Sequence, residues 1–277
     1  MNAIEIQNIS KSYKDFKLDN VSFNLPTGCV LGLIGENGAG KSTTIKSILD
    51  AIDIEAGTIN VLGKNNKLLD KNDIGVITDE FGMPDCLNAL QLESVMSSIY
   101  REWNHDEYHR LCSILNVPMD KIFKELSMGN KMKIRIAIAL SHNASLLILD
   151  EPTNGLDPLV RDEVINLLFD FTRNDNNSVL ISSHIVSDLE KVCDYICFMH
   201  NGKNIIYEEK DELLNNYGIL HYTDNDDIHI DEKAIIRRRE TSYSNELLVD
   251  KRMIGSNIHI SSINLEELFV FMVKEDK

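Results

Sequence analysis

The sequence predicts an α/β fold in which a mostly parallel sheet lies beside an antiparallel β portion near the N-terminus. The first observation is a series of short apolar runs, several of them separated by segments of helical period. Such runs are typical of strands that are buried on both faces of a parallel sheet. They cover residues 29–34, 73–77, 146–150, 178–182 and 194–199. The second observation is the alternation of residues 3–8 and 57–62, which favours antiparallel strands beside that sheet.

A third observation is a mainly helical block, residues 83–143, which interrupts the strand series like an inserted subdomain. Pro84 and Pro118 punctuate it, since proline marks helix boundaries. The expected helices cover residues 88–101, 104–115 and 129–141. A polar break at residues 223–227 precedes more alternating segments and a helical pattern from Leu265 to Lys274. We therefore expect a main domain over residues 1–217, with its helical subdomain at about 83–143, and a small C-terminal extension over 218–277.

Composition excludes several classes of protein. The chain has 277 residues, is 43% hydrophobic and 26% charged, and has a net charge of −16. This acidity argues against nonspecific nucleic-acid binding and against adsorption to anionic lipid by charge alone. No apolar run reaches the roughly 18–20 residues of a membrane span, and the start lacks a signal-peptide pattern. We expect a cytoplasmic protein without direct membrane insertion, so any membrane association needs a protein partner.

The five cysteines are scattered and odd in number, at positions 29, 86, 112, 193 and 197. None of them forms a C-x-x-C pair. Such spacing favours reduced, buried thiols over a disulfide or a metal site.

The most informative segment is a glycine-rich loop between an apolar strand pattern and a helix start. It reads Gly35-Glu36-Asn37-Gly38-Ala39-Gly40-Lys41-Ser42-Thr43 and fits the phosphate-binding pattern G-x-x-x-x-G-K-[ST]. Glycines let the backbone approach a polyphosphate, and successive N–H groups with the helix N-terminus bind it. Lys41 adds a positive charge for the terminal phosphates, and Ser42 adds a hydroxyl for Mg²⁺. The loop predicts a P-loop NTPase core that binds a polyphosphate with Mg²⁺, and such a loop alone fits many nucleotide-binding proteins.

Two carboxylates form the second half of the predicted site. Four apolar residues lead directly into Asp150 and Glu151, followed by Pro152. Ligands of open α/β sheets bind outside the carboxyl ends of the strands, so both acids are expected to face the phosphates. Asp150 is expected to hold the Mg²⁺ shell, through water. Glu151 is expected to orient the attacking water or to accept its proton.

The third signal is Ser182-Ser183-His184, which follows the apolar run of residues 179–181. An imidazole at a neighbouring strand end can contact the γ-phosphate and respond to its loss. A lone histidine is usually a surface or packing residue, and only the two preceding signals favour a functional role.

In this order, the motifs of residues 1–217 resemble those of the nucleotide-binding subunits of ABC transporters. Leu126-Ser127-Met128-Gly129-Asn130 is similar to the signature sequence of that family, and Ser127 is expected at a helix N-cap. The resemblance implies that Ser127 and Gly129 complete the site of an opposite subunit, so that two ATP molecules lie between two cassettes. It further implies that Tyr13 stacks on adenine, that residues 154–157 cross the dimer interface, and that His184 is a switch histidine.

The chain departs from the family pattern in two places. Met128 and Asn130 replace a glycine and the glutamine of the signature, which predicts altered affinity across the interface. The loop that joins core and helical block normally carries a glutamine, and here Asp79, or Glu80 with a shift of one residue, takes that place. Near phosphate a carboxylate adds repulsion unless Mg²⁺ offsets it, so Asp79 is a candidate metal ligand.

The resemblance implies an ATP-hydrolysing subunit that powers transport, with a lean to export, through a separate integral membrane permease. The second cassette is either an identical chain or a paralogue, and the subunit is expected to lie peripherally on the inner face of the cell membrane. Two alternatives remain from the residues: a soluble ABC-type ATPase not coupled to transport, and a regulatory module that binds nucleotide without turnover. For residues 218–277, regulation and dimer contact both stay open.

Overall fold

A six-stranded sheet forms the centre of the computed structural model, which describes residues 1–78, 82–222, 230–240, 245–255 and 258–274. Its strand order is β10-β9-β3-β8-β7-β6, and only the β9–β10 pair is antiparallel. The strands are β3 (Val30–Ile34), β6 (Ile74–Ile77), β7 (Leu146–Asp150), β8 (Ser178–Ser183), β9 (Tyr195–His200) and β10 (Lys203–Glu209). The predicted mostly parallel sheet is therefore confirmed.

Both faces of this sheet are covered, which explains its apolar strands. In β7, Leu147 and Leu149 belong to the core beneath the helices, whereas Leu146 and Ile148 belong to a second core on the opposite face. Successive side chains of a strand point to opposite faces, so a strand between two cores needs an apolar residue at every position.

The second core is closed by a four-stranded antiparallel sheet of order β2-β1-β4-β5 and by α1 (Lys41–Ile48). Its strands are β1 (Asn2–Ser12), β2 (Lys17–Pro26), β4 (Ala56–Val61) and β5 (Lys64–Asn65). The predicted antiparallel strands correspond to β1 and β4, which pair directly. Strand β2 was not predicted, although Val21, Phe23 and Leu25 alternate with more exposed residues.

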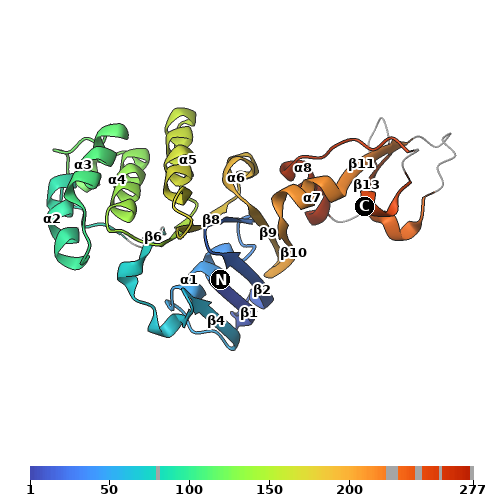
Figure 1. Ribbon diagram of the computed structural model, residues 1–277, viewed down its shortest axis with the longest axis horizontal. Helices are drawn as coiled ribbons and strands as arrows, with labels where there is room; N and C mark the ends of the chain where they lie inside the picture. The colour runs from blue at the N-terminus through green and yellow to red at the C-terminus, as the bar shows by residue number, and fades with distance from the viewer. Residues whose placement is uncertain (79–81, 223–229, 241–244, 256–257, 275–277) are drawn as a thin grey trace.

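The helical block lies at one end of the molecule (Figure 1). It contains α2 (Ala89–Ile99), α3 (His105–Ile114) and α4 (Met128–Leu140), each within one or two residues of its predicted bounds. Asn88 and Asn104 accept backbone N–H groups of the first turns of α2 and α3, and these caps fix where the two helices begin. The helices bury their apolar residues in the core that they share with the parallel sheet.

The C-terminal segment lies at the opposite end of the molecule (Figure 1). Its three-stranded sheet has the order β11-β13-β12, with β11 (Tyr217–Tyr222), β12 (Ile235–Glu240) and β13 (Asn245–Asp250). The remaining helices are α5 (Pro158–Thr172), α6 (Val186–Val192), α7 (Lys210–Asn216) and α8 (Leu265–Val273). Helix α8 contacts α6, and its Phe269 lies edge-on to Phe198 of β9 at 5.2 Å between ring centroids. The C-terminal helix is thus packed against the main domain.

The five cysteines are all free, as expected, but the expectation that all are buried is wrong. Cys112, Cys193 and Cys197 are buried, Cys29 is half-buried, and Cys86 is exposed in the segment before α2. Burial raises the pKa of the Cys112 thiol to about 11, and it raises the pKa of Cys193 and Cys197 further. A raised pKa keeps a thiol protonated, and the thiolate is the reactive form.

We therefore expect Cys86 to react first with an aromatic disulfide reagent at pH 8. The three buried thiols should react only after denaturation. Counting released thiolate with and without urea measures this order, with Cys86→Ser as the control that removes the fast phase. In the native Cys86→Ser protein, the half-buried Cys29 is the one thiol outside the buried set. Rapid reaction of more than one thiol in that variant would therefore contradict the described packing.

Candidate functional site

A pocket of about 500 Å³ lies where the glycine loop meets the carboxyl end of β7. Its walls come from the loop and the start of α1, from the end of β7, and from one residue after β1. The lining residues are Phe16, Glu36, Asn37, Gly38, Gly40, Lys41, Ser42, Thr43, Asp150, Glu151 and Asn154. The structure thus brings the predicted phosphate loop and both predicted acids to one cavity, as expected for the carboxyl ends of parallel strands.

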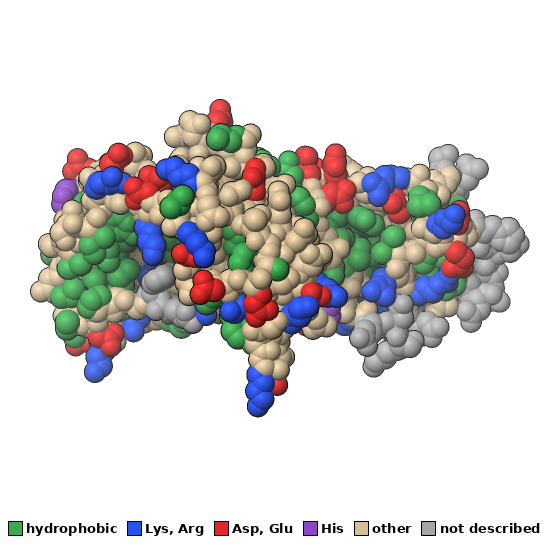
Figure 2. All heavy atoms as spheres, turned by 90° about the horizontal axis from the view of Figure 1, so that it is seen from below, with side chains coloured by type: hydrophobic (Ala, Val, Ile, Leu, Met, Phe, Trp, Pro, Cys, Tyr) green, Lys and Arg blue, Asp and Glu red, His purple; other side chains and the backbone are tan. Residues whose placement is uncertain are grey.

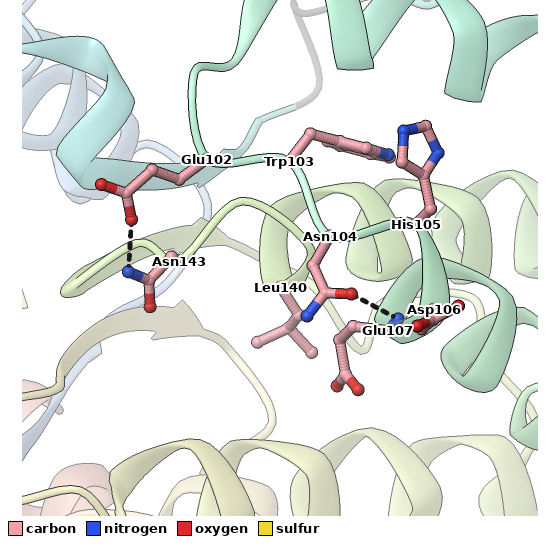
Figure 3. Close-up of a pocket in the computed structure, with 8 residues that line it drawn as sticks. All are labelled: Glu102, Trp103, Asn104, His105, Asp106, Glu107, Leu140 and Asn143. Carbon is pink, nitrogen blue, oxygen red and sulfur yellow. Dashed lines mark hydrogen bonds between the residues drawn. The ribbon is translucent and has the colours of Figure 1, made fainter.

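A larger pocket of about 610 Å³ lies in the helical block (Figure 3). It is bounded by residues 102–107, Leu140 and Asn143. Glu102 accepts a hydrogen bond from Asn143, and Asn104 caps the helix at the Glu107 N–H (Figure 3). The lining of this larger pocket contains neither a glycine loop nor a lysine. Its size alone therefore does not make it the candidate nucleotide site.

The backbone of the glycine loop fits an anion. Gly40 precedes α1 with a φ of 109°, and no side chain caps the first turn of the helix. Gly38 has a φ of 83°, so both positions favour glycine. An uncapped helix N-terminus presents unpaired N–H groups and the positive end of its dipole. Gly35 is needed for another reason, because a Cβ there would lie 2.6 Å from the Met199 carbonyl oxygen.

Lys41 is held inside the pocket and is only 5% exposed. Its Nζ donates to the carbonyl oxygens of Gly35 at 2.6 Å and Glu36 at 3.3 Å, and lies 3.1 Å from Glu151 Oε1. A largely buried ammonium group needs such partners. The ion pair places the predicted cation and the predicted general base in direct contact.

Glu151 also contacts His184, so the three predicted catalytic residues form one chain of contacts. His184 Nδ1 lies 2.7 Å from Glu151 Oε2, and the His184 N–H donates to the same oxygen at 3.2 Å. An ionised carboxylate only accepts, so Nδ1 carries the hydrogen in this contact. Glu151 has a φ of 51°, an uncommon conformation for a residue other than glycine. Such strained residues cluster at functional sites.

Ser42 and Asp150 supply the oxygen atoms that suit Mg²⁺. Both line the pocket, one with a hydroxyl and one with a carboxylate. Among the described residues, no cluster of three or more His, Cys, Asp or Glu side chains has the arrangement of a metal site. Mg²⁺ commonly takes one or two protein oxygens and fills its other positions with phosphate oxygens and water. The residues therefore fit an ion that arrives with a nucleotide.

Several expected site residues do not line the described pocket, among them Gly35, Ala39 and His184. Tyr13 does not line it; Phe16 does, and the two ring centroids are 6.3 Å apart. The sequence carried a signal for Phe16, since both aromatic residues stand in the same turn between β1 and β2. Asp79 and Glu80 lie outside the described residues.

Ser127 is the N-cap of α4, as predicted, and its hydroxyl accepts from the Asn130 N–H at 3.3 Å. It is exposed, and neither Ser127 nor Gly129 lines the pocket of the same chain. A Cβ on Gly129 would lie 3.5 Å from Leu156 Cδ2. The signature segment therefore lies against the loop of residues 154–157 and contributes nothing to the lining of the pocket in its own chain.

A phosphate-binding loop before an uncapped helix, with paired acids at the end of a parallel strand, defines a P-loop nucleotide-binding protein. Comparison with known proteins makes the class more specific. Residues 18–154 match the model of the ABC transporter family. The chain is 37% identical over 221 residues to the lantibiotic transport ATP-binding protein SrtF of Streptococcus pyogenes. This alignment covers 77% of this chain and 96% of SrtF.

A relative that aligns over nearly the whole chain and two solved structures are also similar to this protein. The bacitracin transport ATP-binding protein BcrA of Bacillus licheniformis is 30% identical over 98% of this chain and 97% of its own length. A solved ATP-binding subunit of an ABC transporter superposes with a TM-score of 0.68 and 26% identity, over 77% of this chain and 92% of the other. The dimeric MJ0796 cassette has the same fold, with a TM-score of 0.67 and 22% identity over 74% and 98% of the two chains.

The chain belongs to the ATP-binding proteins of ABC transporters. It is an ATPase of this family and the ATP-binding subunit of a transport system. Among the described residues, no helix is both long and apolar enough to span a bilayer.

Proposed function

We propose that Mg-ATP is bound in the pocket between the glycine loop and β7, and that its γ-phosphate is transferred there to water. The observation that carries this proposal is the contact chain Lys41–Glu151–His184, which starts at the uncapped N-terminus of α1. Phosphoryl transfer needs mainly positioning and charge stabilisation, and this arrangement provides both. Release of phosphate from Mg-ATP by the purified chain tests it, with Lys41→Ala as the inactive reference.

Each residue of the pocket has a distinct proposed role. The N–H groups of residues 35–43 and the Lys41 ammonium hold the phosphates, which requires Lys41 Nζ to turn from Glu151 toward the ligand. Ser42 and Asp150 would hold Mg²⁺, which neutralises phosphate charge when bound. Glu151 orients the attacking water and accepts its proton, and His184 positions Glu151 and contacts the γ-phosphate. Tyr13 is proposed to contact adenine together with Phe16.

We propose further that Ser127 and Gly129 act on the nucleotide of a second cassette, either an identical chain or a paralogue. Support comes from the exposure of Ser127 at the start of α4 and from its absence from the pocket of its own chain. The helix N-terminus behind it is a second site that favours an anion. A solved cassette of the same fold is dimeric.

The partner that carries the cargo is proposed to be a separate integral membrane permease, which would hold this subunit at the inner face of the membrane. Hydrophobic side chains gather at the end of the surface formed by the helical block (Figure 2). On α2, Val95 and Ile99 are one turn apart and are 37% and 59% exposed. Apolar surface of this kind marks protein contact sites.

Replacing Ile99 by Asp should therefore reduce recovery of the subunit with membranes that contain its permease, by about tenfold. Co-sedimentation with those membranes measures it. The control is Ile205→Asp, which makes the same change at a 39% exposed isoleucine of β10, at the edge of the six-stranded sheet opposite β6. Equal recovery of both variants would place the permease contact elsewhere, provided that both still bind ATP.

The cargo is proposed to belong to the class named for the two relatives, lantibiotics and bacitracin, and the direction is proposed to be export. The support is the identity to SrtF and BcrA. Sensitivity of cells to the two compounds after deletion of the gene tests the cargo.

We also propose that residues 1–217 form the cassette, with its helical subdomain at about 83–143, and that residues 218–277 form an extension. The separate sheet β11-β13-β12 supports this division.

A further inference from the structure

We propose that Ser182 is the positioning residue that holds Asp150 and Glu151 in the geometry required for Mg²⁺-dependent ATP binding. This inference rests on the proposed function of the pocket, because it concerns how the two acids are set. Ser182 does not line the pocket and would not touch the nucleotide. Its effect is therefore expected through Asp150 and Glu151 alone.

The sheet register places Ser182 beside the acids. Asp150 of β7 is paired with Ser182 of the parallel strand β8, and both residues are buried. The Ser182 hydroxyl donates to Asp150 Oδ1. The same hydroxyl accepts the backbone N–H of Glu151 at 3.1 Å, and that N–H is shared with the Ser182 carbonyl oxygen at 3.2 Å. One side chain thus contacts both acids.

The direction of these hydrogen bonds follows from the groups themselves. The Glu151 N–H can only donate, so the hydroxyl must accept there, and its own hydrogen is free for the Asp150 carboxylate, which accepts. The hydrogen bond from Ser182 holds Oδ1 of Asp150 and so fixes the rotamer of the Asp150 side chain. It thereby also fixes the orientation of the second Asp150 oxygen, which is the one expected to serve the Mg²⁺ shell.

The same hydroxyl also supports an unusual backbone conformation. Glu151 has a φ of 51°, which is unfavourable for a residue other than glycine unless its surroundings hold it in place. The hydrogen bond from its N–H to Ser182 is one such restraint, and the contacts of its side chain with Lys41 and His184 depend on that backbone. Loss of the hydroxyl should loosen both acids while it leaves the glycine loop unchanged.

The test compares affinity for ATP with and without Mg²⁺ by calorimetry, using the full chain. In Ser182→Ala we expect the affinity for Mg-ATP to fall about tenfold, as for a lost hydrogen bond to a charged group, while the affinity for ATP in EDTA stays within about twofold. Ser182→Cys keeps nearly the same volume but has a weak donor, so it should show the same selective loss.

Ser178→Ala is the matched control. Ser178 lies in the same strand, is equally buried, and accepts the Gly28 N–H at 3.0 Å, but it lies at the opposite end of β8 from the pocket. It should lower the melting temperature without changing the gain in affinity that Mg²⁺ provides. Thermal unfolding of all variants separates loss of fold from loss of geometry, and the cysteine variant serves if the alanine variant does not fold.

The outcomes separate this inference from the proposed function. If the wild-type chain binds ATP no better with Mg²⁺ than without it, the metal-dependent site and the role of Ser182 are both wrong. If the wild type shows the gain and the folded Ser182 variants keep it in full, the pocket stands and the role of Ser182 is wrong. An equal loss in Ser178→Ala would also overturn it, because the effect would then be one of general packing.

Discussion

Replacing Glu151 by Gln should lower ATP hydrolysis by about 10²–10⁴-fold and leave ATP binding intact. The amide has nearly the shape of the carboxylate but cannot accept a proton from water. In the structure this side chain lies 3.1 Å from Lys41 Nζ and 2.7 Å from His184 Nδ1, so it stands between the phosphate-binding cation and the expected switch residue. Because ATP persists, a pair of cassettes closed on ATP should also persist.

Phosphate release measures the first effect, and gel filtration in Mg-ATP measures the second, as a peak at twice the mass of the subunit. Glu163→Gln provides the control, since it makes the same change on α5, outside the described pocket. A hydrolysis rate like that of the wild type in Glu151→Gln would show that Glu151 does not handle the water.

The second large effect concerns two residues that we expect to act on one nucleotide from different subunits. Lys41→Ala removes the cation of the phosphate loop, and Ser127→Ala removes the hydroxyl of the opposite signature. Each variant alone should lose about 10²–10³-fold in turnover, as for loss of a group that stabilises transition-state charge. A mixed dimer contains one site with both changes and one site with neither.

An equal mixture should therefore regain about a quarter of the wild-type rate, because random pairing makes half of the dimers mixed and each has one intact site. Mixing Lys41→Ala with Glu151→Gln is the control, since both changes lie on the same side of the site. In that mixed dimer each site carries one change, so no intact site arises. Recovery confined to the control, or no recovery in a mixture whose mixed dimers are shown to form, would contradict a shared site.

The parallel sheet and the phosphate loop were predictable because their causes are local in the sequence. A strand buried on both faces must be apolar throughout, as β7 is, and the loop needs glycine at Gly38 and Gly40 for a positive φ. The acids at the end of β7 were predictable because the carboxyl end of a parallel strand is where a sheet of this class binds its ligand.

Other features depend on which segments meet in space, and local patterns do not contain that information. Ser182 acts on Asp150 only because β7 and β8 are paired in one register. The reason for Gly35 is the Met199 carbonyl, which belongs to β9, a strand far along the chain. Phe16 lines the pocket and Tyr13 does not, although both rings stand in the turn between β1 and β2, and the sequence pattern does not show which of them reaches the cavity.

Calorimetric titration of Mg-ATP into the purified chain tests the central claim most directly, namely that the loop of residues 35–43 grips a triphosphate. We expect saturable binding with one nucleotide per chain, which Lys41→Ala weakens by at least about tenfold while its melting curve still shows a folded protein. No measurable heat from a folded wild-type chain, or an affinity that Lys41→Ala leaves unchanged, would contradict the account.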